Sequence, residues 1–202
     1  QLSIDRIREK YLTKSNDQDS NFSDYLNTIT KQIKDIEFLL NEFSDFARMP
    51  KPVFKYNDLK DIILLNIELL KKLDKDIVFS FNSKKSTKFN FDYEQINRVV
   101  FNLIKNSIES LEEKCQKTAN FNKNIDIEIQ DHIDYISLTI IDTGLGFKNI
   151  NTKELTKPYF TTKLDGTGLG LSIVSKIIND HNGAIFFMNI KNGAKVQIKF
   201  YK

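Results

Sequence analysis

The spacing of apolar residues predicts two helices at the start of the chain. Residues 1–14 carry apolar side chains on one helical stripe, and a polar connector follows at 15–21. A longer helix is predicted over 22–48, because apolar residues recur there at alternating spacings of four and three, as in a heptad repeat. The positions of this heptad seam are Phe22, Leu26, Ile29, Ile33, Ile36, Leu40 and Phe43.

A helical seam of this kind needs a partner surface. The two helices could pack on each other as one hairpin, or they could form half of a dimeric four-helix bundle. We favour the dimer, because two helices alone bury little apolar surface. Pro50 and Pro52 end the second helix, so the sequence predicts a helical-hairpin domain over 1–50 and a second domain over 51–202.

The second domain alternates between strand and helix patterns. Strands are predicted at 54–56, 76–82, 88–91, 124–130, 135–141, 183–190 and 194–201. Helices are predicted at 59–73 and 93–117, after the capping residues Asp58 and Asp92, and from about 168 to 181. This order predicts an α+β fold, a sandwich in which an antiparallel or mixed sheet carries helices on one face.

Composition narrows the classes of function. Sixteen Phe and seven Tyr can fill a core that lacks Trp, and a net charge of +3, spread along the chain, does not favour nucleic-acid binding. Cys115 is the only cysteine, which fits a reducing compartment such as the cytoplasm. No apolar run is long enough to cross a bilayer, so no membrane contact is expected. A chain that begins with Gln1 is interpreted as part of a larger protein.

The glycines are concentrated in one region. All seven follow residue 143, and five of them lie between Gly144 and Gly170. The segment DTGLG (142–146) leaves a predicted strand, and GTGLGLSIV (166–174) enters a predicted helix. Free backbone N–H groups at a helix N-terminus favour an anion such as a phosphate. The spacing matches neither a P-loop nor a dinucleotide-binding motif.

Two further segments carry groups suited to a metal–phosphate site. In NLIKNSIES (102–110), Asn102 and Asn106 share one helix face among apolar neighbours, and an Asn oxygen can bind Mg²⁺. In PYFTTK (158–163), Thr161, Thr162 and Lys163 could donate to a polyphosphate, although the string alone could equally be an ordinary loop.

Taken in order, these segments resemble the catalytic domain of sensor histidine kinases, in the GHKL (Bergerat-fold) ATPase superfamily. NLIKNSIES resembles the N box, DTGLGF the first glycine box, PYFTTK the F box and GTGLGLSIV the second glycine box. NEFSDFARMPKP (41–52) resembles the junction before the catalytic domain in nitrogen-regulation kinases of the NtrY and NtrB type. The resemblance covers essentially the whole chain. It implies a histidine kinase-like α/β sandwich after a dimerisation hairpin.

The resemblance also implies roles for particular residues. Asn106 is expected to bind Mg²⁺, with Asn102 assisting at the phosphates of ATP, and Asp142 is expected to accept a hydrogen bond from the adenine amino group. Gly144 and Gly146 would let the loop pass close to the nucleotide. The residues expected at the phosphates are Thr161, Thr162 and Lys163 through side chains, and Gly166, Thr167, Gly168, Leu169 and Gly170 through the backbone. Asn102, Asn106 and Lys163 would be the catalytic groups, and residues between Gly146 and Gly166 would form a lid.

Two departures from the family pattern matter. The phosphoacceptor His of the first bundle helix is missing, and we expect His132 and His181 to be structural or solvated. The chain should therefore bind Mg·ATP without phosphorylating itself, and transfer phosphate to a His outside the chain, for relay to a response regulator. Lys195 stands where relatives often carry a small hydroxyl residue, so the contact that the resemblance implies there, on the adenine side of the site, is not expected to be the same.

Two alternatives remain open at this stage. The chain could be a non-catalytic scaffold for nucleotide binding and dimerisation, against which the intact Asn106 and Asp142 argue. It could also be another GHKL ATPase or a serine kinase of the superfamily, whereas the heptad helix and its junction favour a histidine kinase. By the same resemblance the chain would belong to a membrane-anchored sensor.

Overall fold

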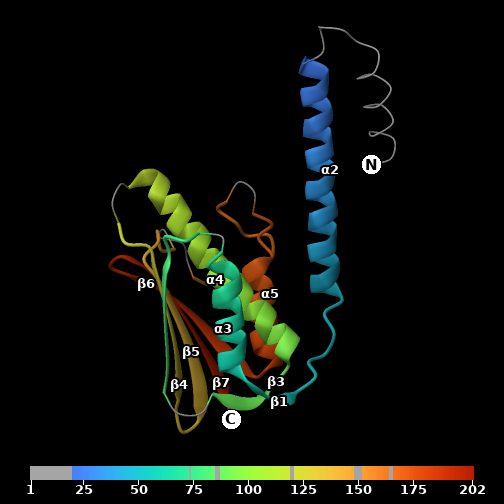
Figure 1. The fold of residues 1–202 in the computed structure, drawn as a ribbon. Coiled ribbons are helices and arrows are strands. Elements are labelled where there is room, and N and C mark those ends of the chain that lie inside the picture. The colour runs from blue at the N-terminus through green and yellow to red at the C-terminus, as the bar shows by residue number, and fades with distance from the viewer. Residues whose placement is uncertain (1–19, 73, 85–86, 119–120, 148–151, 164–165) are drawn as a thin grey trace. The chain divides into compact units, whose positions relative to one another are not determined.

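The computed structural model describes residues 20–202 apart from 73, 85–86, 119–120, 148–151 and 164–165 (Figure 1). The chain divides into two compact units, Gln1–Met49 and Pro50–Lys202. The helix predicted over 1–14 lies outside the described residues. Within the described part, no helix combines the length and apolar character of a membrane span.

The first unit is represented by helix α2 (Ser20–Ala47). Leu26 is buried, but the later heptad positions are uncovered, with exposed fractions of 45% for Ile29, 56% for Ile36, 61% for Leu40 and 47% for Phe43. The predicted seam is therefore a helix surface on which large apolar side chains remain in contact with solvent. Burying such side chains stabilises by about 1.5–3 kcal/mol each, so this surface favours association.

The second unit is built on a five-stranded sheet with the order β2-β4-β5-β7-β6. Its strands are β2 (Val78–Lys84), β4 (Asn124–Asp131), β5 (Tyr135–Asp142), β7 (Gly193–Tyr201) and β6 (Gly183–Ile190). β2 pairs with β4 in parallel, and the other pairs are antiparallel. A separate antiparallel pair is formed by β1 (Lys55–Asp58) and β3 (Lys88–Phe91).

Helices α3 (Leu59–Leu70), α4 (Tyr93–Lys117) and α5 (Gly170–Asp180) cover one face of this sheet (Figure 1). The predicted α+β sandwich is confirmed. The side chains of Asp58 and Asp92 accept hydrogen bonds from the backbone N–H groups of Lys60 and Gln95, as expected for N-caps.

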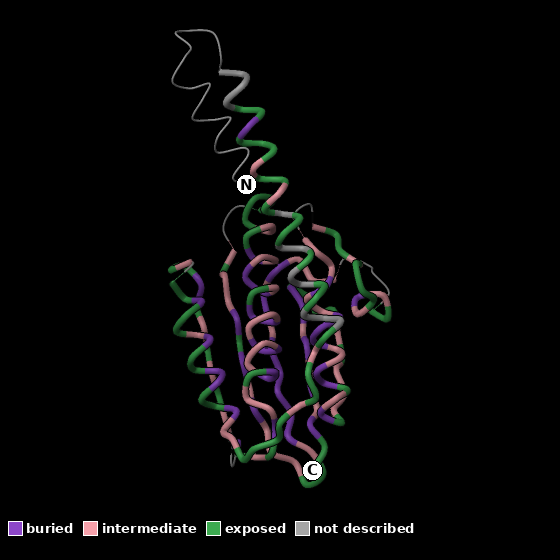
Figure 2. Tube along the Cα trace, turned by 90° about the vertical axis from the view of Figure 1, so that its right-hand side faces the viewer, coloured by how far each residue is buried: buried purple, intermediate pink, exposed green. Residues whose placement is uncertain are grey.

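The core lies between the helices and the sheet, where Figure 2 shows the buried residues. The inward faces of β4 and β5 are aliphatic, and they meet the apolar face of α4 and much of α5. Fully or nearly fully buried members are Ile125, Ile127, Ile129, Leu138 and Ile140 from the strands, Ile96, Val99, Val100, Leu103, Ile104, Ile108 and Leu111 from α4, and Ile173, Val174, Ile177 and Ile178 from α5. This packing holds α4 in one rotation about its axis.

Both histidines make contacts within the second unit. His181 is buried, its Nδ1 lies 2.8 Å from the Ile177 carbonyl oxygen, and its Nε2 accepts a hydrogen bond from the Asp92 N–H at 3.1 Å. Burial lowers the pKa of His181, so the neutral ring joins the end of α5 to the start of α4. The ring of His132 stacks on Tyr135 with centroids 4.3 Å apart.

Candidate nucleotide-binding site

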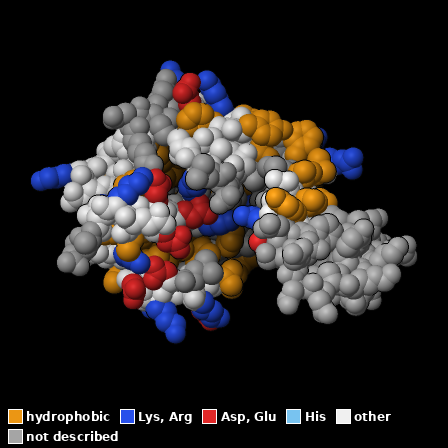
Figure 3. Space-filling model, turned by 90° about the horizontal axis from the view of Figure 1, so that it is seen from above, with side chains coloured by type: hydrophobic (Ala, Val, Ile, Leu, Met, Phe, Trp, Pro, Cys, Tyr) orange, Lys and Arg blue, Asp and Glu red, His pale blue; other side chains and the backbone are white. Residues whose placement is uncertain are grey.

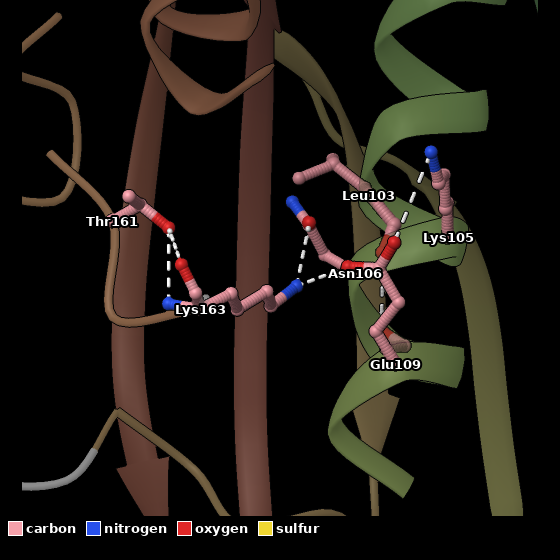
Figure 4. A network of polar contacts seen from close by, with 7 residues as sticks. Leu103, Lys105, Asn106, Glu109, Thr161 and Lys163 are labelled. Carbon is pink, nitrogen blue, oxygen red and sulfur yellow. Dashed lines mark hydrogen bonds and ion pairs between the residues drawn. The ribbon is translucent and has the colours of Figure 1, made fainter. Parts of the chain in front are cut away.

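The middle of α4 and the segment before α5 meet at Asn106. Figure 4 shows the Lys163 ammonium group between two residues of α4. Its Nζ donates to the Asn106 side-chain oxygen at 3.3 Å and forms an ion pair with Glu109, which also lies 3.8 Å from the Lys105 ammonium. The structure thus brings together Asn106, the predicted metal ligand, and Lys163, the predicted phosphate-binding cation, although they lie far apart in the sequence.

This contact places a positive charge against hard oxygen atoms. An amide oxygen and a carboxylate one helical turn apart are ligands that also suit Mg²⁺. Among the described residues, no group of three or more His, Cys, Asp or Glu side chains could hold a metal ion. A Mg²⁺ ion at Asn106 would therefore need further oxygen atoms from phosphates or water, as is usual for Mg²⁺ bound with a nucleotide.

The start of α5 faces Asn102. The Asn102 amide nitrogen donates to the Arg98 carbonyl at 3.0 Å, and its side-chain oxygen would lie 3.5 Å from a Cβ placed on Gly170. No side chain caps the first turn of α5. Its N–H groups and the positive end of the helix dipole are therefore directed toward the end of the site marked by Asn102, which suits an anion.

The segment before α5 has the tight geometry that its glycines predict. Gly168 has φ +67°, and a Cβ there would lie 2.4 Å from the Tyr159 carbonyl carbon, so only glycine fits. Helix α5 therefore begins at Gly170, two residues after the predicted start. Tyr159 itself has φ +65°, a backbone conformation that is strained for a residue other than glycine. Its side chain is 60% exposed.

Hydroxyl groups of this segment already make local hydrogen bonds. Thr161 Oγ1 accepts from the Lys163 N–H at 3.1 Å, Thr167 Oγ1 accepts from the Leu169 N–H at 3.2 Å, and Thr162 is exposed. The Gly166 N–H donates to the Lys163 carbonyl at 3.3 Å. Phosphate binding by these backbone groups would replace the bonds of Gly166 and Leu169.

Asp142 ends β5 in a buried position with an exposed fraction of 5%. One carboxylate oxygen accepts the Gly144 N–H at 2.8 Å, and the Ser107 hydroxyl lies 3.4 Å from the other. Burial raises the pKa of Asp142, and hydrogen bonds from the Gly144 and Ala194 N–H groups and from Ser107, together with the charge of Lys114, act in the opposite direction. A buried carboxylate of this kind can select a ligand that offers a hydrogen-bond donor.

The strand register shows which residue of β7 lies beside Asp142. Asp142 pairs with Ala194, whereas Lys195 pairs with Ile141. Successive side chains of a strand point to opposite faces, and Ala194 is buried beneath the helices. Lys195 therefore lies on the opposite face of the sheet from Ala194 and the Asp142 side chain.

Several polar residues around the loop after β5 were missed by the sequence analysis. Ser107, Ser110 and Lys114 of α4 all contact residues 142–145, and Asn189 accepts a hydrogen bond from the Phe147 N–H at 2.7 Å. The signal was present in α4, because spacings of three and four place polar residues on one helix face. Gly146 has φ +71° and lies between these contacts.

The surface seen from above carries both signs of charge. Figure 3 shows acidic and basic side chains next to one another near the centre of this view, with no extended basic area visible on it. The part of the surface described in this view therefore mixes both signs of charge.

Comparisons with known proteins agree with this geometry. The family described as "Histidine kinase-, DNA gyrase B-, and HSP90-like ATPase" matches residues 91–202. A putative NtrY-like sensor histidine kinase of Rickettsia prowazekii is 35% identical over 202 residues, covering 98% of this chain and 32% of that protein. Nitrogen regulation protein NtrY of Azorhizobium caulinodans is 31% identical, covering 98% of this chain and 26% of that protein. The chain thus spans about a third or less of these relatives.

Solved structures give the same fold. The catalytic domain of histidine kinase ThkA matches with a TM-score of 0.65 and 28% identity, covering 74% of this chain and 96% of that one. ThkA in complex with the response regulator TrrA matches with a TM-score of 0.71 and 24% identity, covering 98% of this chain and 56% of that one. This second likeness concerns the fold alone.

The contact between Lys163 and Glu109 generates a prediction. Replacing Glu109 with Gln should tighten ATP binding in the absence of Mg²⁺ by about two- to fivefold, because an ion pair at a partly exposed position contributes up to about 1 kcal/mol. The change releases Lys163 for the phosphates and removes a carboxylate that repels them. Titration calorimetry with ATP and a chelator measures the effect.

Glu113→Gln is the matched control, because Glu113 forms an ion pair with Lys117 on the same helix, at 2.7 Å. The control should bind ATP like the parent chain. Unchanged or weaker binding by Glu109→Gln would mean that the ion pair does not compete with the nucleotide.

Proposed function

Since the chain belongs to the histidine kinase-, DNA gyrase B- and HSP90-like ATPase family, and its closely matching relatives include NtrY-type sensor kinases, we propose that it binds Mg·ATP and transfers the γ-phosphoryl group to a His outside this chain. The observation that carries the proposal is the arrangement around α4. Asn102 and Asn106 lie beside Lys163 and the start of α5, while Ser107 on the same helix contacts Asp142. A nucleotide could therefore contact a base-recognising and a phosphate-binding group along one helix.

The base end would recognise adenine through Asp142. One of its oxygens is engaged by the Gly144 N–H, which leaves the carboxylate with acceptor capacity for the exocyclic amino group of the purine. Guanine presents a carbonyl oxygen at that position, so two acceptors would face each other. Such an unmatched buried acceptor discriminates strongly between ligands.

The phosphate end would work by positioning and charge neutralisation. Mg²⁺ held by Asn106 would neutralise part of the charge on the phosphate oxygens when bound. Lys163 would leave Glu109 and pair with a phosphate, and Asn102 would assist from one helical turn earlier. The backbone N–H groups at the start of α5, with Thr161, Thr162 and Thr167 beside them, would orient the chain of phosphates.

The acceptor must come from elsewhere in this proposal. His181 is buried with both ring nitrogens engaged, and the ring of His132 is stacked on Tyr135. Further relay to a response regulator is supported by the relatives, which are named sensor histidine kinases. A cytoplasmic location is proposed because ATP is available in that compartment, and because the single Cys of this sequence fits a reducing environment.

Dimerisation is proposed through α2. Ile36 and Leu40 are exposed, with fractions of 56% and 61%, although they continue a heptad seam. Two copies of such a seam can bury each other in a two-fold bundle. The competing proposal, a non-catalytic scaffold, predicts the same dimer. Only a test of phosphoryl transfer therefore distinguishes the kinase from the scaffold.

Nucleotide binding by two variants tests the site. Asn106→Ala should lose the Mg²⁺-dependent part of ATP affinity, whereas Asp142→Ala should lose about ten- to a hundredfold of the preference for ATP over GTP, since a hydrogen bond to a charged group is removed. Asn82→Ala and Asp134→Ala, at exposed positions of the same unit, are the controls. If both site variants bind like the parent chain in calorimetry, the assignment is wrong.

Transfer in trans tests the reaction. The chain is mixed with labelled ATP and a helical fragment of an NtrY-type relative that carries the acceptor His. We expect phosphate on that fragment that is labile in acid and stable in base, and none with Asn106→Ala. ATP binding without any transfer would favour the scaffold.

Sedimentation equilibrium tests the dimer. The parent chain should sediment as a dimer, and the double variant Ile36→Lys, Leu40→Lys as a monomer, because two charges would be buried in each seam. Lys34→Glu, at an exposed position off the seam, should remain dimeric. A monomeric parent chain at tens of micromolar would exclude this interface, since an obligate bundle dimer would be expected to persist at about that concentration.

A further inference from the structure

Helix α4 holds the loop after Asp142 through two residues to which neither the family match nor the proposed function gives a role. The Lys114 ammonium donates to the carbonyl oxygen of Thr143 at 2.6 Å and to that of Gly144 at 3.1 Å. The Ser110 hydroxyl oxygen accepts the Leu145 N–H at 3.0 Å. These residues lie one turn apart on α4, on the side that faces the loop.

The contacts act on both sides of the same peptide units. The unit joining Thr143 to Gly144 accepts a hydrogen bond from Lys114 through its carbonyl, while its N–H donates to the Asp142 carboxylate at 2.8 Å. The next unit likewise accepts from Lys114 and donates to Ser110. Because a peptide unit is planar, a bond at each end fixes its rotation.

A charge at the carbonyl end also strengthens the donor at the other end. Hydrogen bonds in series polarise one another, and bonds from an ammonium group are stronger than neutral ones. Lys114 therefore acts on Asp142 through a single peptide unit. Its charge also helps to lower the pKa of Asp142 against the effect of burial, which keeps the carboxylate an acceptor.

Further contacts restrict this loop beside the clamp that Lys114 and Ser110 form. A Cβ on Gly144 would lie 2.2 Å from the Ser110 hydroxyl oxygen, so the bare backbone rests directly on α4. Thr143 is tied on its other side, where its hydroxyl donates to the Asn122 carbonyl at 2.6 Å and accepts from the Asn124 N–H at 3.0 Å. The ammonium group sits 4.9 Å from the ring centre of Phe121, so Lys114 is held in place as well.

We propose that Lys114 and Ser110 are positioning residues for purine recognition, which orient the Asp142 carboxylate by fixing the two peptide units that follow it. This inference rests on the proposed function, in which Asp142 reads the base. Neither residue touches the nucleotide in this role. Their effect should therefore be confined to the base end of the site and should disappear when Asp142 is absent.

The experiment measures the affinity of variants for AMP, ATP and GTP by calorimetry. Lys114→Met keeps much of the length of the side chain and removes its charge. It should weaken AMP and ATP binding alike, by about tenfold, as expected for the loss of a charge-assisted hydrogen bond. The ratio of ATP affinities with and without Mg²⁺ should stay as in the parent chain. Lys114→Arg should restore most of the affinity, and Ser110→Ala should lose about threefold, because its bond is neutral.

Lys117→Met is the matched control, because Lys117 is an exposed lysine of the same helix that pairs with Glu113. The decisive comparison is a double-mutant cycle with Asp142→Ala. In that background, Lys114→Met should change AMP affinity by less than about twofold. If Lys114→Met binds AMP like the parent chain, or weakens it equally with and without Asp142, the positioning role is excluded.

The same data separate the inference from the proposed function. Loss of adenine preference by Asp142→Ala together with parent-like binding by Lys114→Met would reject the clamp alone. Parent-like binding by Asp142→Ala would reject the proposed base recognition itself. Should Lys114→Met fail to fold, Ser110→Ala tests the second peptide unit with a smaller change, and parent-like affinity for AMP would then reject the clamp.

Discussion

The site depends on how helix α4 packs against the five-stranded sheet. The apolar side of α4, which includes Ile104, Ile108 and Leu111, is fully buried and fixes the rotation of the helix. With that rotation set, the polar residues of α4 are directed to the loop after β5 and to the segment before α5. A rotation of α4 by one residue, about 100°, would move Asn106 away from Lys163 and Ser107 away from Asp142. Core packing therefore sets the geometry of the polar groups.

Both ends of the site balance a charge against its surroundings. At the proposed phosphate end, Lys163 forms an ion pair with Glu109 and a hydrogen bond with the side-chain oxygen of Asn106. In the proposed complex a nucleotide would replace these contacts, so its net affinity would be the difference between two sets of ionic interactions. At the proposed base end, Asp142 is buried, which favours its neutral form, and the donors around it act against that tendency. In the proposed complex Lys163 would thus exchange its ionic partner, whereas Asp142 would keep the donors that surround it.

Element boundaries differed from the sequence predictions for local reasons. Strand β2 spans Val78–Lys84, shifted from the predicted 76–82, because it pairs with β4 and the pairing starts at Val78 opposite Asn124. Helix α5 starts after Gly168, whose positive φ is incompatible with a helix. In both cases the apolar pattern located the element, whereas its ends were decided by partners or by backbone conformation.

Periodicity and motif order were sufficient to predict the α+β sandwich, the helix with Asn102 and Asn106, and the glycine-rich loops, because these features depend on residues close together in the chain. Only the folded chain revealed that Lys163 reaches Glu109, that Ala194 rather than Lys195 lies opposite Asp142, and that Lys114 holds the loop after β5. These contacts join residues from distant parts of the chain. Strand register and helix rotation bring them together, and both follow from packing of the whole domain, which no local pattern encodes.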